Sequence, residues 1–372
     1  MRKVHLSNIV PGMELGKTVY SSSGQVLLME GMILNEKFIK RLADLGVLAV
    51  FIKDGLTDDV PVPDLIDDKT RVETQQAVKE VFSSFEKGRS FDLSNISSHV
   101  NRIMDELLAS NEILFDLTDI RTFDDYTFQH SVNVCILALI TGISLGYNQL
   151  QLRDLGIGAL LHDMGRIKIS KDILFKPGAL TEAEYASVQK HCTLGFEVLR
   201  KYENINLISA HVAFQHHEKF DGTGYPRGLT GEQIHEYARI VTYCDVYDAL
   251  TTDRPYRKAY QPKEALKIIK DSIGSVFDPK IASAFFRNVV IFPVGSIVQL
   301  NSGEVGVIVH NNKEFINQPI VRIIIDKNHQ RLEQPVDINL VENRALQIKR
   351  ILNDSDPLVP SITKLQERIE CI

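Results

Sequence analysis

A helical pattern of apolar residues, running from about residue 119 to residue 290, most constrains the fold of this chain. The pattern is interrupted at Lys176-Pro177-Gly178 and at Asp221–Pro226, where glycine and proline favour turns. After Pro293 short apolar runs alternate with Asn, Gly and Ser turns, which is typical of strands. The expected strands are 297–300, 305–309 and 320–325. We therefore predict a mainly α fold in which a helical bundle carries a short β-rich C-terminal extension from residue 293.

Residues 1–60 predict a small α+β domain of their own, to which we assign a regulatory role. Two short apolar runs, Val19-Tyr20 and Val26–Leu28, flank a Ser/Gly turn and indicate a β-hairpin. Asn35 is a candidate N-cap for a short helix that Gly46 would end, and residues 47–52 then have the pattern of a strand.

The segment 61–118 predicts a linker followed by two amphipathic helices. We interpret their apolar stripes as core or inter-helix contacts, and we expect a homodimer to form through residues 65–118. Residues 119–345 would form the main domain, including the β-rich extension, and residues 346–372 would form a polar, peripheral tail.

Composition and charge exclude several classes of protein. The formal net charge of −6 and the pI near 6.0 provide no basic stripe for duplex nucleic acid. The N-terminus lacks the apolar run of a signal peptide, and the most apolar stretch, Val134–Leu145, is too short for a membrane span. The cysteines are scattered, without a CxxC pair. We therefore expect a cytoplasmic protein that binds neither duplex nucleic acid nor a membrane.

Histidines and aspartates with the chemistry of metal ligands recur along the helical region. They are His130, His162-Asp163, His191, His216-His217 and Asp245. Imidazole nitrogen and carboxylate oxygen suit Fe, Mn, Zn or Ni, and a carboxylate can bridge two ions. Because each group lies on a predicted helix, a bundle could direct all of them at one centre. A single histidine in an apolar helix, such as His211, is more often a core or surface residue. The combination, rather than any one member, predicts a metal centre.

Longer motifs around these residues resemble the HD-GYP family, a branch of the HD superfamily of metal-dependent phosphohydrolases. The spacing of His130, His162-Asp163 and Asp245 is similar to the superfamily pattern. The runs His216–Leu229 (HHEKFDGTGYPRGL) and Asp245–Arg257 (DVYDALTTDRPYR) resemble the HD-GYP motifs almost residue for residue. The resemblance covers residues 119–345 and implies that this domain is an HD-type helical bundle with a catalytic role.

The resemblance also implies the ligands and the cofactor. One ion would be held by His130, His162, Asp163 and Asp245. The other would be held by His191, His216 and His217, with Asp163 as the bridge. The cofactor would be two divalent transition-metal ions, Fe or Mn. Some family members carry a glutamate four residues before the first histidine and hold a third metal. Tyr126 stands at that position here, which favours two ions.

The implied reaction is hydrolysis of cyclic di-GMP to linear pGpG and/or GMP by a metal-bridging hydroxide. The implied catalytic residues are Asp163, Arg166 and Asp248. Arg166 replaces the family's lysine, and an arginine can neutralise a phosphate but cannot donate a proton to a leaving oxygen. Asp248 lies one helical turn beyond Asp245 and could orient a ligand or bind the attacking water.

The candidate substrate-binding residues lie beside the same motifs. They are Arg166, Gly222, Gly224, Tyr225, Pro226, Arg254 and Arg257. The glycine-flanked Tyr225 offers a face for guanine stacking, and Arg254 and Arg257 could clamp a phosphate. Without the flanking motif the same features are typical of a plain turn and of solvated helix-end cations. We also expect the loop around Tyr225 to contact signalling proteins.

Three alternatives stay open at this point. The chain could be a catalytically weak cyclic dinucleotide sensor or interaction module, which Arg166 favours and the complete ligand set opposes. It could be a cyclic GMP-AMP phosphodiesterase with the same chemistry. It could also hydrolyse another nucleotide, although the loop around Tyr225 argues against that.

Overall fold

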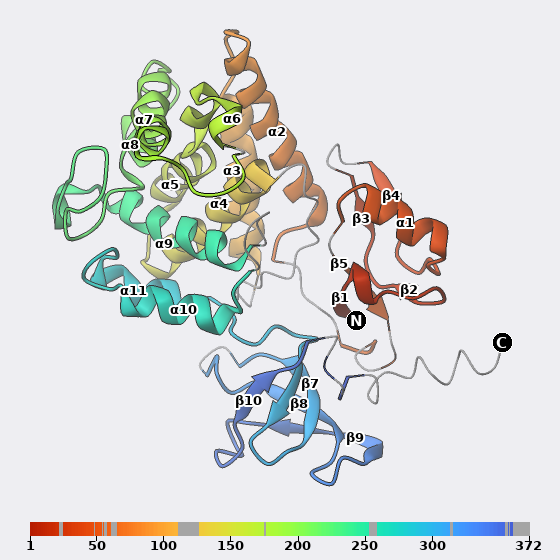
Figure 1. Ribbon diagram of the computed structural model, residues 1–372. Coiled ribbons are helices and arrows are strands. Elements are labelled where there is room, and N and C mark those ends of the chain that lie inside the picture. The colour runs from red at the N-terminus through yellow and green to blue at the C-terminus, as the bar shows by residue number, and fades with distance from the viewer. Residues whose placement is uncertain are drawn as a thin grey trace. The chain divides into compact units, whose positions relative to one another are not determined.

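The computed structural model contains two compact units (Figure 1). It describes residues 1–21, 25–47, 49–53, 55, 58–60, 65–110, 126–174, 176–252, 259–312, 315–353, 356 and 358–359. One unit is helical and is built from the described parts of 65–115 and 127–289. The other combines the described parts of 1–64 with those of 290–372, so that the β-rich C-terminal segment groups with the N-terminal residues.

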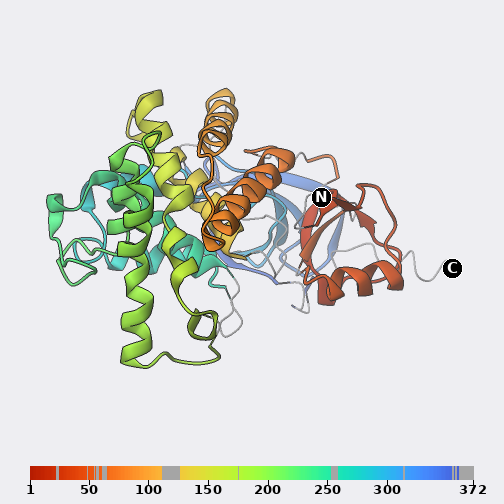
Figure 2. The ribbon, with the colours of Figure 1, turned by 90° about the horizontal axis from the view of Figure 1, so that it is seen from above.

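The helical unit confirms the mainly α fold. Its helices are α2 (Asp68–Glu86), α3 (Ser94–Ala109), α4 (Tyr126–Ser144), α5 (Gln149–Leu161), η3 (Met164–Lys168), α6 (Lys171–Leu174), α7 (Glu182–Leu199), α8 (Leu207–Gln215), η4 (Gly231–Gln233), α9 (Glu236–Thr251), α10 (Pro262–Asp271) and α11 (Pro279–Phe286). Helices α5 and α7 begin at capping boxes. In each box the N-cap side chain accepts a hydrogen bond from a backbone amide of the first turn, and a side chain of that turn accepts one from the N-cap amide. Helix α8 packs against both α5 and α7 (Figure 1), and the same helices can be followed from above in Figure 2.

Helix α4 is an apolar and largely buried element of this unit. It is longer than the apolar run Val134–Leu145 suggested, and among the described helices it is the one long and apolar enough to cross a membrane. However, 78% of the window Thr127–Ser144 is buried inside the protein. A helix that is apolar all round is typical of a protein core as well as of a membrane span, and here its neighbours cover it.

Helices α2 and α3 follow the predicted amphipathic pattern and pack against each other. Their apolar stripes are buried within the helical unit, including Val78, Phe82, Val100 and Leu107. These stripes are therefore core contacts, and a homodimer through residues 65–118 would have to use other faces of the two helices.

The N-terminal residues form the predicted α+β arrangement. The elements are β1 (Arg2–His5), η1 (Leu6–Asn8), β2 (Glu14–Leu15), β3 (Val19–Tyr20), β4 (Val26–Leu28), α1 (Glu36–Asp44) and β5 (Ala49–Lys53). Strands β3 and β4 pair antiparallel, which confirms the hairpin, and β5 lies between β1 and β2 in a second sheet. The Asn35 side chain accepts the amide hydrogen bond of Phe38 at 3.0 Å, as predicted for an N-cap.

The C-terminal segment forms a five-stranded sheet in the order β10-β6-β7-β8-β9. Strands β6 (Ile297–Leu300), β7 (Val305–His310) and β8 (Ile320–Ile325) match the three predicted strands. Strands β9 (Arg331–Asn339) and β10 (Ile348–Ile351) were not predicted, and β10 lies inside the segment expected to be a polar tail. Both are edge strands rich in charged and polar side chains, so they lack the apolar alternation by which a strand is found in a sequence.

Candidate metal centre

Five elements of the helical unit bring the predicted ligands together. His130 lies on α4, His191 on α7 and Asp245 on α9. The two pairs do not lie within helices, as the sequence suggested: His162-Asp163 follows the last residue of α5, and His216-His217 follows the last residue of α8. The C-terminal end of a helix carries partial negative charge, so ligands placed there approach a cation from a favourable direction.

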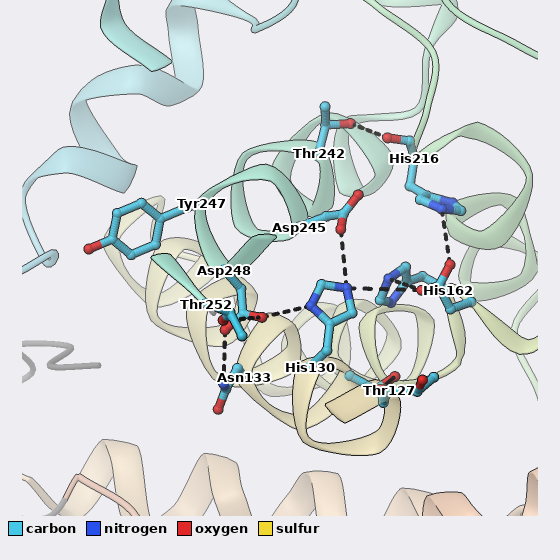
Figure 3. A network of polar contacts seen from close by, with 12 residues as sticks. Thr127, His130, Asn133, His162, His216, Thr242, Asp245, Tyr247, Asp248 and Thr252 are labelled. Carbon is cyan, nitrogen blue, oxygen red and sulfur yellow. Dashed lines mark hydrogen bonds and ion pairs between the residues drawn. The ribbon is translucent and has the colours of Figure 1, made fainter. Parts of the chain in front are cut away.

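The first group of ligand atoms consists of His130, His162 and Asp245 (Figure 3). Its candidate ligand atoms all lie within 4.8 Å of one another. The Nε2 atom of His130 is 3.1 Å from Oδ1 of Asp245. All three side chains are buried, so this group is enclosed by protein.

The second group consists of Asp163, His191, His216 and His217, again with candidate ligand atoms within 4.8 Å of one another. The Nε2 atoms of His191 and His216 are 3.3 Å apart. His217 is the most exposed member, with 22% of its side chain accessible, and its Nδ1 is 3.9 Å from Oδ2 of Asp245. His211 belongs to neither group and instead packs against the ring of Phe196 at 4.8 Å.

Asp163 faces both groups with different oxygens. Its Oδ2 lies 3.4 Å from Nε2 of His162 and 4.0 Å from Nε2 of His130. Its Oδ1 lies 3.5 Å from Nε2 of His191 and 3.7 Å from Nε2 of His216. A carboxylate that presents one oxygen to each set of imidazoles has the arrangement of a bridge between two ions.

Hydrogen bonds to Nδ1 leave Nε2 directed at the centre in four of the histidines. The Nδ1 of His162 contacts the carbonyl of Ala159 at 2.7 Å, and that of His191 contacts the carbonyl of Val188 at 2.6 Å. His216 Nδ1 has the same kind of partner in Ala213 at 3.1 Å, and His130 Nδ1 contacts Asp248. Such contacts favour the tautomer whose Nε2 lone pair is available to a metal.

The protonation states also suit metal ligands. Burial lowers the pKa of His191 to about 3, and burial together with His216 lowers the pKa of His217 well below its usual value. Burial acts to raise the pKa of Asp163, but Arg166 and His162 outweigh it and hold that pKa well below the usual range. These histidines are therefore neutral and Asp163 is ionised at neutral pH, which is the state that binds a cation.

The buried polar atoms of the centre fit a bound metal. His162 Nε2 and both carboxylate oxygens of Asp163 are buried, and within the described part of the chain none of them forms a hydrogen bond, although Oδ1 of Asp163 is in an ion pair with Arg166. Burying such atoms without partners is costly. Divalent cations would satisfy all three, so the residues present fit a metal cofactor.

Arg166 and Asp248 support the centre in different ways. The Nε of Arg166 forms an ion pair with Oδ1 of Asp163 at 2.8 Å, and 31% of the Arg166 side chain is exposed. Asp248 is fully buried, and its Oδ2 is 2.7 Å from Nδ1 of His130. Of the two roles that the sequence left open for Asp248, this contact favours the orientation of a candidate ligand.

The loop that contains Gly222, Gly224, Tyr225 and Pro226 packs beside the second group. The ring of Tyr225 lies 4.9 Å from the ring of His217, and its backbone amide donates to the carbonyl of His217 at 3.1 Å. A β-carbon at Gly224 would lie only 2.5 Å from Cα of Glu218. The loop therefore contacts the metal centre through Tyr225, whereas Pro226 is exposed. Arg254 and Arg257 lie outside the described residues.

Two functional residues of this region were not found in the sequence. Buried Glu218 accepts hydrogen bonds from the backbone amides of Arg227 at 2.8 Å and Leu229 at 2.9 Å, and so holds the end of the loop. Gly165 lets η3 approach α7, because a β-carbon there would overlap the carbonyl of His191. Glu218 could have been found in the sequence, because it is a carboxylate next to two histidines. Gly165 could not, because its role depends on a contact between distant segments.

Comparisons with family models cover most of the described fold. An HD domain model matches residues 102–281, and a model of a KOW domain associated with HD domains matches residues 297–357. The first match contains every candidate ligand, and the second contains the sheet β10-β6-β7-β8-β9.

Individual proteins are similar over the same regions. A cyclic di-GMP phosphodiesterase of Pseudomonas aeruginosa is 36% identical over 277 residues, which are 74% of this chain and 66% of that protein. A 3′3′-cGAMP-specific phosphodiesterase of Vibrio cholerae is 38% identical over 168 residues, which are 45% of this chain and 36% of that protein. The chain thus spans two thirds or less of the length of these relatives. The solved structure of an HDG"Y"P protein of Bdellovibrio bacteriovorus can be superposed on this chain with 19% sequence identity and a TM-score of 0.49. The match covers 76% of this chain and 97% of the Bdellovibrio chain.

Proposed function

Because the chain belongs to the HD-GYP family of HD-domain proteins, we propose that it is a metal-dependent phosphodiesterase that hydrolyses a cyclic dinucleotide. The observation that carries the proposal is the position of Asp163, whose two oxygens face two separate sets of histidines. A protein that merely bound a nucleotide would not need a buried carboxylate shared between two sets of metal ligands.

The cofactor that suits these ligands is a pair of divalent transition-metal ions, and we propose Fe or Mn. His130, His162 and Asp245 would hold one ion, His191, His216 and His217 would hold the other, and Asp163 would serve both. Bound there, the ions would neutralise charge on the phosphoryl oxygens and activate water for attack on phosphorus.

The residues of the chain itself prepare the centre for an anionic substrate. Asp248 fixes the ring of His130, and Asp163 fixes the distance between the two groups. Arg166 lies at the border between the buried ligands and solvent, where its guanidinium can meet a phosphate. Hydrolysis adds water across one P–O ester bond of the ring and gives a linear dinucleotide, and a second hydrolysis gives mononucleotides.

The substrate class follows from the relatives named above, which act on cyclic di-GMP or on 3′3′-cGAMP. The test is to incubate the full chain, loaded anaerobically with Fe or Mn, with each cyclic dinucleotide and to separate the products by chromatography. We expect loss of cyclic di-GMP and appearance of pGpG or GMP. Metal-loaded protein that binds a cyclic dinucleotide without cleaving it would show instead that the chain is a sensor.

Arg166 provides a prediction about transition-state charge. Arg166→Ala should reduce kcat/KM, because a cation beside the phosphate is lost. The reduction should correspond to a loss of about 2–4 kcal/mol of transition-state stabilisation. Arg166→Lys should retain most activity, since a lysine ammonium also neutralises a phosphate. Metal content, measured by elemental analysis, should be unchanged in both variants. A large gain of activity in Arg166→Lys would show that the family's lysine acts as a proton donor which arginine cannot replace.

Tyr225 provides a prediction about substrate recognition. Its ring contacts His217, so Tyr225→Ala should lower hydrolysis of a small nitrophenyl phosphodiester by a modest factor, about tenfold or less. Turnover of a cyclic dinucleotide should fall further, because a stacking face worth about 1–3 kcal/mol per base is also removed. Tyr225→Phe keeps the ring and should retain both activities. Equal losses for both substrates in Tyr225→Ala would assign Tyr225 to support of the metal centre alone.

A further inference from the structure

Asp248 is also held through its second carboxylate oxygen, the one that does not contact His130. Its Oδ1 accepts a hydrogen bond from Nδ2 of Asn133 at 2.8 Å, while its Oδ2 contacts Nδ1 of His130 (Figure 3). All three residues are buried. Thr252 lies 3.5 Å from Oδ2 of Asp248, too far to fix the carboxylate by itself.

The geometry of two helices explains how this contact arises. Asn133 lies three residues after His130 on α4, and Asp248 lies three residues after Asp245 on α9. Residues separated by three positions share one face of a helix. His130 and Asn133 therefore share one face of α4, and both contact Asp248, which lies one turn beyond Asp245 on α9.

A third helix determines the orientation of the Asn133 amide. Nη1 of Arg71, on α2, donates to Oδ1 of Asn133 at 3.1 Å. An asparagine amide has a donor end and an acceptor end, and the guanidinium has donors alone. The hydrogen bond from Arg71 therefore fixes the oxygen of the Asn133 amide, and the NH2 group of Asn133 is left directed at the carboxylate of Asp248.

We propose that Arg71 and Asn133 are positioning residues of the metal centre and act on His130 through Asp248. The inference rests on the proposed function to the extent that His130 holds a metal. Arg71 fixes the Asn133 amide, Asn133 fixes the Asp248 carboxylate, and Asp248 sets the tautomer and ring plane of His130. The position of α2, the helix that follows the linker from the N-terminal residues, therefore affects the first group of metal ligands.

Cobalt(II) binding to the metal-free full-length chain tests this proposal without requiring turnover. The absorption spectrum of bound cobalt reports the geometry of its ligands, and competition with a chelator gives the affinity. Asn133→Leu should change the spectrum and weaken binding at one site by about 10–100-fold, the usual effect of losing a residue that orients a metal ligand. Arg71→Met should change the spectrum in the same direction with a smaller loss.

Further variants separate positioning from a general effect on the fold. Arg71→Lys retains one donor for Asn133 and should restore most of the affinity lost in Arg71→Met. The double variant Arg71→Met/Asn133→Leu should bind cobalt no more weakly than Asn133→Leu, because Arg71 acts through Asn133. Arg102→Met is the matched control: it removes another arginine of the α2–α3 pair, which contacts Glu73 at 2.5 Å, and should leave spectrum and affinity unchanged.

The proposal would be overturned if Asn133→Leu and Arg71→Met both showed wild-type affinity and spectrum while Asp248→Asn changed them. That result would mean that Asp248 positions His130 without help from Asn133 or Arg71. Equal losses in Arg71→Met and Arg102→Met would also overturn it, since they would indicate a general loosening of α2. If Asn133→Leu fails to fold, the two Arg71 variants decide. Wild-type protein that binds cobalt but cleaves neither cyclic dinucleotide would refute the proposed function and leave this inference standing.

Discussion

Replacing Asp163 with alanine should abolish metal binding at both groups of ligands and lower kcat/KM by about a thousandfold or more. The reason is that Asp163 belongs to the second group through Oδ1 and faces the histidines of the first group through Oδ2, so one substitution removes a carboxylate oxygen from both places. Metal ions in such sites supply several kcal/mol of transition-state stabilisation, and each 1.36 kcal/mol corresponds to a tenfold change in rate. Loss of His191, which belongs to the second group alone, should weaken one site and spare the other.

Elemental analysis of anaerobically purified protein measures this effect directly, with about two ions per chain expected in the wild type. Asp154→Ala is the control, because Asp154 is another aspartate of the helical unit, partly buried and hydrogen-bonded to Asn206 at 2.6 Å, that belongs to neither group of ligands. It should retain both ions. An Asp163→Ala protein that still binds two ions would show that Asp163 is not the bridge and that the two groups assemble independently.

The ligands themselves could be predicted from the sequence because their chemistry is local. A His-Asp pair and a His-His pair are visible as neighbours in the chain, and long motifs surround them. The structure then brings His130, His191 and Asp245 to the same place from three other helices. What the sequence missed is that both pairs lie just beyond helix ends. An apolar run that continues to the last turn gives no signal of where a helix stops.

The residues that support the ligands were harder to find for a different physical reason. Arg71 and Asn133 are 62 positions apart in the chain, and Asn133 and Asp248 are 115 apart. No periodicity or spacing connects them, since the contacts depend on how α2, α4 and α9 pack. Strand β9 was missed because its side chains are mostly exposed, so its place in the sheet rests on backbone pairing with β8.

Gly165→Ala should disrupt the second group of ligands although Gly165 binds nothing itself. A β-carbon at this position would overlap the carbonyl oxygen of His191 and lie 2.6 Å from the backbone nitrogen of Gly195. Backbone atoms cannot rotate away as a side chain does, so η3 and α7 must separate. Asp163 precedes η3 and His191 lies on α7, so their separation increases the 3.5 Å distance between Oδ1 of Asp163 and Nε2 of His191.

The expected result is a loss of about 3 kcal/mol or more in the free energy of unfolding, at the upper end of what overpacking costs, together with loss of about one metal ion per chain. Denaturant unfolding and elemental analysis on the same sample measure both. Gly195→Ala tests the same contact from the α7 side, where a β-carbon would approach Gly165 no closer than 3.2 Å and a small shift relieves it. Because alanine also favours the helical state by about 1 kcal/mol over glycine, Gly195→Ala should be close to neutral and retain both ions. If Gly165→Ala keeps both ions and full stability, the close approach of η3 to α7 is not what brings His191 to Asp163.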